Sequence, residues 1–164
     1  MSRPLLLAAL TAAAVVATAP AYAQSQADRE ALRALAAEAD RAWNVKDADA
    51  MAALYAQDAS LLFVPRYAKV EGRDAIRAQF QTAFAGRQGN MRHVTTVGDL
   101  VFSGPDAVFS DSYVRVEQVN PDGTATLVRW FVNHSLAVRG EDGVWRLKAV
   151  RAHQRPLEEA RPAG

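Results

Sequence analysis

The chain of 164 residues contains no cysteine, so it can form no disulfide and cannot carry a lipid on a mature N-terminal cysteine. It also lacks an excess of either charge, because Lys and Arg total 19 against 18 Asp and Glu. The basic residues are scattered and form no stripe that could follow a phosphate backbone, which argues against nucleic acid as a partner. The sequence contains no GxGxxG, Walker lysine loop or HExxH motif, and we predict no cofactor and no metal.

The one long apolar stretch lies at the N-terminus, from Leu5 to Ala19, after a single basic residue. Ala21-Tyr22-Ala23 follows it with the small-x-small pattern that secretory peptidases cleave. An uncleaved membrane anchor is the alternative, but the stretch is shorter than the ~20 residues that cross a bilayer. Residues 1–23 are therefore predicted to be a signal peptide, and the protein to be exported, periplasmic or secreted, with no membrane attachment after cleavage.

The first half of the mature chain has helical periodicity. A capping pattern at Ser25 and Asp28, followed by apolar residues at helical spacing from Leu32 to Trp43, predicts an amphipathic helix of about 20 residues. Asp47 is a suitable N-cap for a short second helix that carries Met51 and Tyr55. A β-rich run from Ser60 ends at Pro65, and a third helix starts at Gly72. Three helices and a short strand are thus expected before residue 90.

From Met91 onward the apolar residues alternate with a period of two. Strong turn signals separate four predicted strands, at 91–103, 106–119, 124–139 and 144–154. Short turns make neighbouring strands antiparallel, and no linker divides the two halves. The prediction is one α+β domain over residues 24–154, in which the helices cover one face of a curved meander sheet, followed by a flexible tail at 155–164.

Pairing through the predicted turns decides which side chains share a face. One face of the sheet carries charged and aromatic groups, whereas the other carries Asn133, Ser135 and several basic residues, as a solvated face would. We expect the first face to lie under the helices and to form either a ligand pocket or a buried polar network. Its members proposed for the site are Phe109, Asp111, Tyr113, Trp130, His134, Arg151 and His153.

Three further residues complete the predicted ligand-binding set. Tyr55 is expected either to offer an inward hydroxyl or only to satisfy the backbone, and Phe63 lies on the short first strand. His93 opens the first strand of the meander, where it either reaches the mouth of the pocket or has a capping or surface role. A metal site formed by Asp111, His134 and His153 is a weaker alternative, since the three residues come from separate strands without a local motif.

The order helix, helix, strand, helix, meander resembles that of the SnoaL-like and SgcJ/EcaC-type members of the nuclear-transport-factor-2-like superfamily. The segments that carry the resemblance are AWNVKDAD at 42–49, ALYAQDA at 53–59, GRDAI at 72–76 and DGVWRL at 142–147. The resemblance covers essentially the whole mature chain. It implies a cone-shaped fold with a pocket between the helices and the sheet, and a homodimer formed through the outer sheet face.

The resemblance does not imply one chemistry, because the superfamily includes isomerases, dehydratases, hydrolases, cyclases and non-catalytic binders. At the positions where ketosteroid isomerases carry their catalytic groups, this chain has Asp40, Leu62 and Phe63, and the run Asn133 to Ser135, which argues against that reaction. Our hypothesis is an exported protein that binds an apolar or aromatic small molecule. If it is catalytic, we expect cofactor-free acid/base chemistry with Asp111 or His134 as the base. The alternative is a non-catalytic binding or dimerisation module with a structural polar core.

Overall fold

The computed structural model describes residues 26–64, 66 and 68–160. The predicted signal peptide and the end of the tail lie outside these residues. Helix α1 spans Gln26–Asn44, α2 spans Ala48–Ala53 and α3 spans Arg73–Ala85. Within the described ranges, no helix is long and apolar enough to cross a membrane.

Six strands form one mixed sheet in the order β2-β1-β6-β5-β4-β3. β1 (Tyr55–Val64) pairs with β2 (Ala68–Glu71) in antiparallel fashion and with β6 in parallel fashion. The other strands form the antiparallel meander, with β3 at Met91–Phe102, β4 at Ala107–Val119, β5 at Ala125–Arg139 and β6 at Trp145–Arg155. The predicted α+β class and cone-shaped meander are confirmed.

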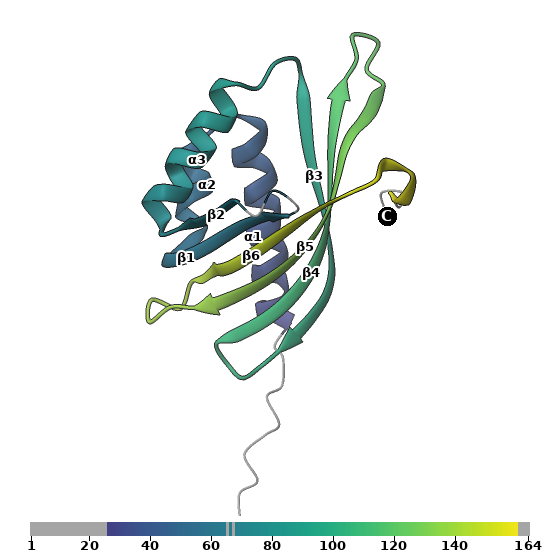
Figure 1. Ribbon diagram of the computed structural model, residues 1–164. Helices are drawn as coiled ribbons and strands as arrows, with labels where there is room; N and C mark the ends of the chain where they lie inside the picture. Colours follow the sequence, from purple (N-terminus) through teal and green to yellow (C-terminus); the bar gives the residue numbers. More distant parts are fainter. Residues whose placement is uncertain (1–25, 65, 67, 161–164) are drawn as a thin grey trace, which may run out of the picture.

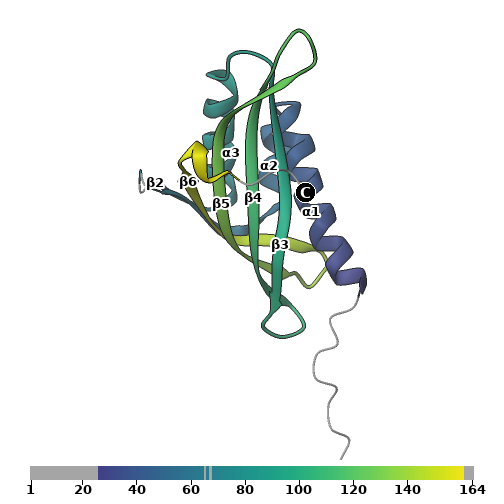
Figure 2. The same cartoon turned by 90° about the vertical axis from the view of Figure 1, so that its right-hand side faces the viewer.

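The three helices lie together on one side of the curled sheet (Figure 1). When the molecule is turned to show its other side, β3, β4 and β5 lie in front and the helices behind them (Figure 2). The sheet therefore has an inner face toward the helices and an outer face that no helix covers. Residues 155–160, which the sequence predicted to be part of a flexible tail, end β6 and form the short 3-10 helix η1 at Leu157–Glu159.

Local sequence signals explain where several elements begin and end. Asp47 caps α2 as predicted, because its side chain accepts a hydrogen bond from the Ala50 amide at 2.8 Å. Gly72 adopts φ of 85°, which favours glycine, at the junction between β2 and α3. Tyr55 was expected in the second helix, but it is the first residue of β1. The change of direction at Leu54 brings the Tyr55 ring against Phe80, with the ring centroids 6.3 Å apart.

The main hydrophobic core lies between the helices and the β1–β6 side of the sheet. Its buried members include Met51, Leu61, Ile76 and Phe84. A second cluster joins Leu32 of α1 to Val108, Ala137 and Trp145 at the opposite end of the sheet. Because the two clusters lie at the two ends of the helical layer, the middle of the inner face is not filled by either of them.

The packing of α3 gives a test of the fold. Replacing the fully buried Ile76 by alanine removes apolar contacts and leaves a cavity, so we expect the free energy of unfolding to fall by roughly 2–5 kcal/mol. The matched change Val45→Ala, at a position that is 61% exposed, should alter it by less than about 0.5 kcal/mol. Urea denaturation followed by circular dichroism measures both. Equal losses in the two variants would contradict this packing.

Candidate active site

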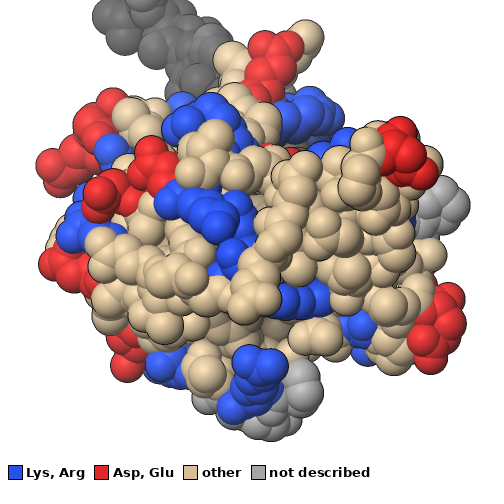
Figure 3. All heavy atoms as spheres, turned by 90° about the horizontal axis from the view of Figure 1, so that it is seen from above, with Lys and Arg blue, Asp and Glu red and all other residues tan. Residues whose placement is uncertain are grey.

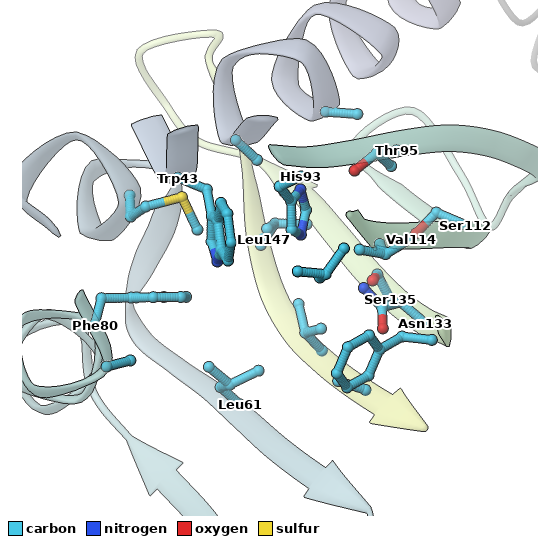
Figure 4. A pocket seen from close by; sticks show the side chains of 18 of the residues that line it. Trp43, Leu61, Phe80, His93, Thr95, Ser112, Val114, Asn133, Ser135 and Leu147 are labelled. Atoms are coloured by element: carbon cyan, nitrogen blue, oxygen red, sulfur yellow. The ribbon is translucent and has the colours of Figure 1, made fainter. Parts of the chain in front are cut away.

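A cavity of about 530 Å³ lies between the helices and the inner face of the sheet. Its volume is within the range of small-molecule sites. The helical wall is apolar and aromatic, and the sheet supplies both apolar and polar side chains (Figure 4). The residues that matter for its chemistry are Trp43, Tyr55, Phe63, Arg87, His93, Thr95, Ser110, Ser112, Asn133 and Ser135.

His93 lines the cavity near the start of β3 and contacts an aspartate of α1. Its Nδ1 atom lies 2.6 Å from Oδ1 of Asp40, and the two side chains are 16% and 21% exposed. Thr95 also bonds Asp40, through its hydroxyl to Oδ1 at 2.6 Å and through its backbone amide to Oδ2 at 2.8 Å. Asp40 is therefore held as a hydrogen-bond acceptor. We call His93 and Asp40 the inner dyad.

Two neighbours of Asp40 on α1 hold His93 in position. The Asn44 side chain accepts a hydrogen bond from the His93 backbone amide at 2.7 Å and donates one to its carbonyl at 3.1 Å. The ring of Trp43 lies beside the imidazole, with centroids 5.1 Å apart (Figure 4). The backbone and the ring of His93 are thus both fixed, and such preorganisation is what a catalytic group requires.

The contact with Asp40 also determines which nitrogen of His93 is free. A carboxylate accepts a hydrogen bond from Nδ1–H, so the neutral imidazole carries its hydrogen on Nδ1. Nε2 then keeps its lone pair and lies on the side of the ring away from Asp40. Because His93 lines the cavity, this lone pair is available to a bound molecule as a base.

Arg87, from the segment that follows α3, completes the wall beside the dyad. Its guanidinium lies 4.1 Å from the centroid of the Trp43 ring and donates hydrogen bonds to the carbonyls of Trp43 at 2.7 Å and Asn44 at 3.2 Å. These carbonyls belong to the last turn of α1, where cations are favoured. Burial lowers the pKa of Arg87 from its ordinary value, but an arginine remains charged.

The end of the cavity near Arg87 lies on the upper side of the molecule as drawn in Figure 1. Seen from that side, basic side chains lie both in the middle of the surface and along part of its edge, whereas acidic ones lie mostly around the edge (Figure 3). Arg129 also lines the cavity and is exposed. A ligand that approaches from this side therefore meets a surface that does not repel electron-rich or anionic groups.

The sheet side of the cavity carries four small polar residues in the middle of the inner face. Cross-strand pairing places Ser110 opposite Ser135 and Ser112 opposite Asn133 on β4 and β5. Within the described part of the chain, none of the four side chains makes a hydrogen bond, and Oδ1 of Asn133 is buried without a partner. An unpaired buried acceptor lowers the free energy of unfolding by about 1–3 kcal/mol. We call Ser110, Ser112, Asn133 and Ser135 the polar strip.

Three of the predicted site residues line the cavity. They are Tyr55, Phe63 and His93. Burial raises the pKa of the Tyr55 phenol well above its ordinary value, so this side chain stays protonated and is no base.

The other seven predicted residues do not line the cavity, and the expectation that they lie under the helices is wrong. Asp111 and His134 do contact each other, at 2.7 Å, but their side chains are 45% and 55% exposed on the outer face. The remaining members of this group share the outer face with them. They are Phe109, Tyr113, Trp130, Arg151 and His153.

The outer face has its own arrangement of rings. Tyr113 stacks on Trp130 at 5.8 Å, and the rings of His134 and His153 meet edge to face at 5.2 Å. Arg151 donates a hydrogen bond to the hydroxyl of Ser60 at 3.2 Å. Within the described ranges no three His, Asp or Glu side chains are arranged to hold a metal ion, so Asp111, His134 and His153 do not form the metal-ligand set considered from the sequence.

A β-bulge explains why the face was assigned wrongly. Ala137 pairs with Leu147 and Leu136 pairs with Ala149, so Lys148 is an additional residue in β6. Strict alternation along β6, without the bulge, would place Trp145 and Leu147 on the same face as Arg151 and His153. With the bulge, Leu147 lines the cavity while His153 faces outward. The mutual grouping of Asp111, Tyr113, Trp130, His134 and His153 on one face is nevertheless confirmed.

Asp40 was not predicted as a partner of His93, and Asn133 and Ser135 of the polar strip were predicted to lie on a solvated face. One signal was available for Asp40. This residue falls within the apolar stripe of α1, four residues after Ala36 and three before Trp43, where an unpaired charge would be costly. The polar strip had no such signal, because residues that line a wet cavity and residues that face solvent have the same composition.

The comparison with protein families identifies the chain. The model of the SnoaL-like domain matches residues 24–151. The chain belongs to the SnoaL-like domain family. This confirms the resemblance at the level of the family and of the nuclear-transport-factor-2-like fold, whereas the SgcJ/EcaC type stays a prediction. No curated protein matches the sequence.

Solved structures of proteins from other organisms share the fold at low sequence identity. A domain of unknown function with a cystatin-like fold from Nostoc punctiforme is 23% identical, has a TM-score of 0.70, and is matched over 82% of each chain. A nuclear-transport-factor-2-like protein from Novosphingobium aromaticivorans is 23% identical with a TM-score of 0.63, over 82% of this chain and 84% of the other. A Catenulispora acidiphila protein in complex with S-DNPA is 21% identical with a TM-score of 0.67, over 79% of this chain and 95% of the other.

The tautomer of His93 is directly measurable. In protein labelled with ¹⁵N, we expect the neutral His93 ring to carry its proton on Nδ1, because Asp40 accepts it. The variant Asp40→Asn can present an amide hydrogen to Nδ1 and should move the proton to Nε2. The matched variant Asp111→Asn on the outer face should leave the His93 signals unchanged. A wild-type ring protonated on Nε2 would contradict the arrangement.

Proposed function

We propose that this SnoaL-like protein binds an apolar or aromatic small molecule in its cavity and removes a proton from it with Nε2 of His93. The observation that carries the proposal is the inner dyad, in which Asp40 holds Nδ1 at 2.6 Å and leaves Nε2 toward the cavity. No cofactor is required for such a step. The base is thus His93, in place of the exposed Asp111 and His134 that the sequence suggested.

The surroundings of the dyad suit proton transfer from a weakly acidic C–H bond. His93 and Asp40 are shielded from bulk solvent, and apolar side chains surround the space in front of the ring, which strengthens electrostatic interactions there. When Nε2 accepts the proton, the imidazolium that forms lies against the Asp40 carboxylate and is stabilised by it. The electron pair left on carbon can form a new double bond, either by expelling a neighbouring leaving group or by shifting an existing double bond.

A complex of one structural neighbour supports the binding part of the proposal. The Catenulispora acidiphila protein is described in complex with S-DNPA. The cavity of the present chain, about 530 Å³, has room for a ligand of one or two rings.

A generic carbon acid tests the base without knowledge of the natural substrate. In 5-nitrobenzisoxazole, transfer of the C3 proton to a base forms the nitrile as the N–O bond breaks and releases a coloured phenolate. We expect the wild type to accelerate this elimination. His93→Gln should remove most of the acceleration, on the order of 10²-fold or more. Asp40→Asn should cause a comparable loss, since it favours the tautomer that has no lone pair on Nε2.

The outer face supplies a matched control for this test. His134→Gln removes the same ring from a second His–Asp contact in the same sheet, at a position outside the cavity. It should leave the rate within about twofold of the wild type, as expected for a group that does not touch the substrate. A loss in His134→Gln with none in His93→Gln would overturn the proposal, as would a wild type no faster than an equal concentration of free imidazole.

We further propose that the mature protein is exported and forms a homodimer through the outer sheet face. Val101 and Phe109 pair across β3 and β4 on that face, and they are 61% and 54% exposed. Two adjacent apolar side chains that remain exposed on the outer face favour an association surface. This apolar pair lies near Asp111 and His134, which supply polar groups at its rim.

Export and pairing are checked on one preparation. Protein recovered from the exported fraction should have an N-terminus near Gln24 and show the mass of a dimer in light scattering. Phe109→Lys should shift it to the mass of a monomer by placing a charge in the apolar contact, while Val45→Lys, at another exposed apolar position, should not. A wild type with the mass of a monomer would rule out the dimer, and an intact N-terminus would rule out cleavage.

A further inference from the structure

The polar strip does not take part in the proton transfer described above. It lies on β4 and β5, whereas the inner dyad lies at β3 and α1. Ser112 is in the same cross-strand row as Val97, and His93 is in the row of Val116. The stretch of β3 from His93 to Val97 separates these rows by roughly 13 Å. The strip therefore contacts a different part of any ligand that reaches His93.

The row between the two sites is apolar apart from Thr95, whose hydroxyl is bonded to Asp40. Cross-strand pairing places Val114 opposite Phe131, in the row between the dyad and the strip, and both side chains line the cavity. The close-up shows Trp43 and His93 together on one side and Ser112, Asn133 and Ser135 together on the sheet side (Figure 4). A ligand that spans the cavity thus meets a base, then an apolar stretch, then a group of unpaired donors and acceptors.

We propose that the ligand is an elongated, mostly apolar molecule that carries a hydroxyl or other hydrogen-bond donor about 10 Å from its reacting carbon. On binding, the Asn133 amide rotates so that its Oδ1, which is buried without a partner, accepts a hydrogen bond from this donor, and the serine hydroxyls of the strip bond the ligand oxygen. This inference rests on the proposed function, because it describes the substrate of the same cavity. It goes further by assigning the strip as the element that selects the substrate.

The energetic reason is the difference between a paired and an unpaired polar group. A purely apolar ligand covers Asn133 and the serines without satisfying them, whereas a ligand with a terminal hydroxyl satisfies both partners at once. A site built in this way rejects the analogue that lacks the hydroxyl. Specificity then comes from the strip and reactivity from the dyad.

Two ligands of nearly equal size test the inference without any reaction. 4-Hydroxybiphenyl and 4-methylbiphenyl differ only by a hydroxyl in place of a methyl group, and neither is a carbon acid that His93 could deprotonate. By calorimetry in a fixed small amount of co-solvent, we expect the wild type to bind the hydroxyl compound about threefold to tenfold more tightly. We call the dissociation constant of 4-methylbiphenyl divided by that of 4-hydroxybiphenyl the binding ratio. A binding ratio of one in the wild type would overturn the inference.

Variants show which residues of the cavity bind the hydroxyl group of the ligand. Asn133→Leu and the milder Ser112→Ala should reduce the ratio toward one with little change in the affinity for 4-methylbiphenyl. Thr96→Val removes a hydroxyl from the opposite face of the same sheet, where Thr96 pairs with Tyr113, and should leave the ratio unchanged. Thermal melting of each variant confirms that it is folded, and Ser112→Ala with Ser135→Ala replaces Asn133→Leu if the latter does not fold.

The same experiment separates this inference from the proposed function. His93→Gln should abolish the elimination of 5-nitrobenzisoxazole and leave the binding ratio unchanged. If His93→Gln lowers the ratio and the strip variants do not, the hydroxyl binds at the dyad and the strip is not the selecting element. If the ratio depends on the strip but no variant changes the elimination rate, the ligand class is supported and the proposed catalysis fails.

Discussion

The attachment of α1 to the edge strand β3 is the contact on which the cavity depends. β3 ends the sheet, so one side of its backbone has no neighbouring strand. Two polar side chains of α1 take the place of that strand, because Asn44 bonds both backbone groups of His93 and Asp40 bonds the amide of Thr95. The helix is thereby fixed across the open side of the curled sheet, and the space between them stays enclosed.

Much of the architecture was predictable because its signals are local. Turn residues and alternation placed all four meander strands within about a residue of their ends, and Asp47 caps α2 as its position suggested. β2 was not predicted, since a strand of four residues at Ala68–Glu71 is too short for a periodic signal. Tyr55 was placed in a helix because the helical pattern of α2 continues past the point where packing on Phe80 turns the chain into β1.

The candidate site was harder to predict, for two physical reasons. The bulge at Lys148 depends on pairing between strands and has no local pattern, yet it changes the face of every following residue in β6. Polarity was also taken as a sign of exposure to solvent, which holds for a filled core but not for a cavity. Asn133 and Ser135 line the cavity, and Phe109 is exposed on the outer face. His93 was among the predicted ligand-binding residues and lines the cavity, but its partner Asp40 lies on a helix 53 positions away in sequence.

Asp40 performs two tasks with one carboxylate, since Oδ1 contacts the imidazole while Oδ2 accepts the amide of the edge strand. In a protein of this fold without catalytic activity, Asp40 would therefore still be needed, because it anchors α1 to β3. An acid here is consequently no signature of catalysis on its own. The histidine is the more informative of the two, and a chain that keeps the aspartate with an inert residue in place of His93 would be a ligand carrier with an intact enclosure.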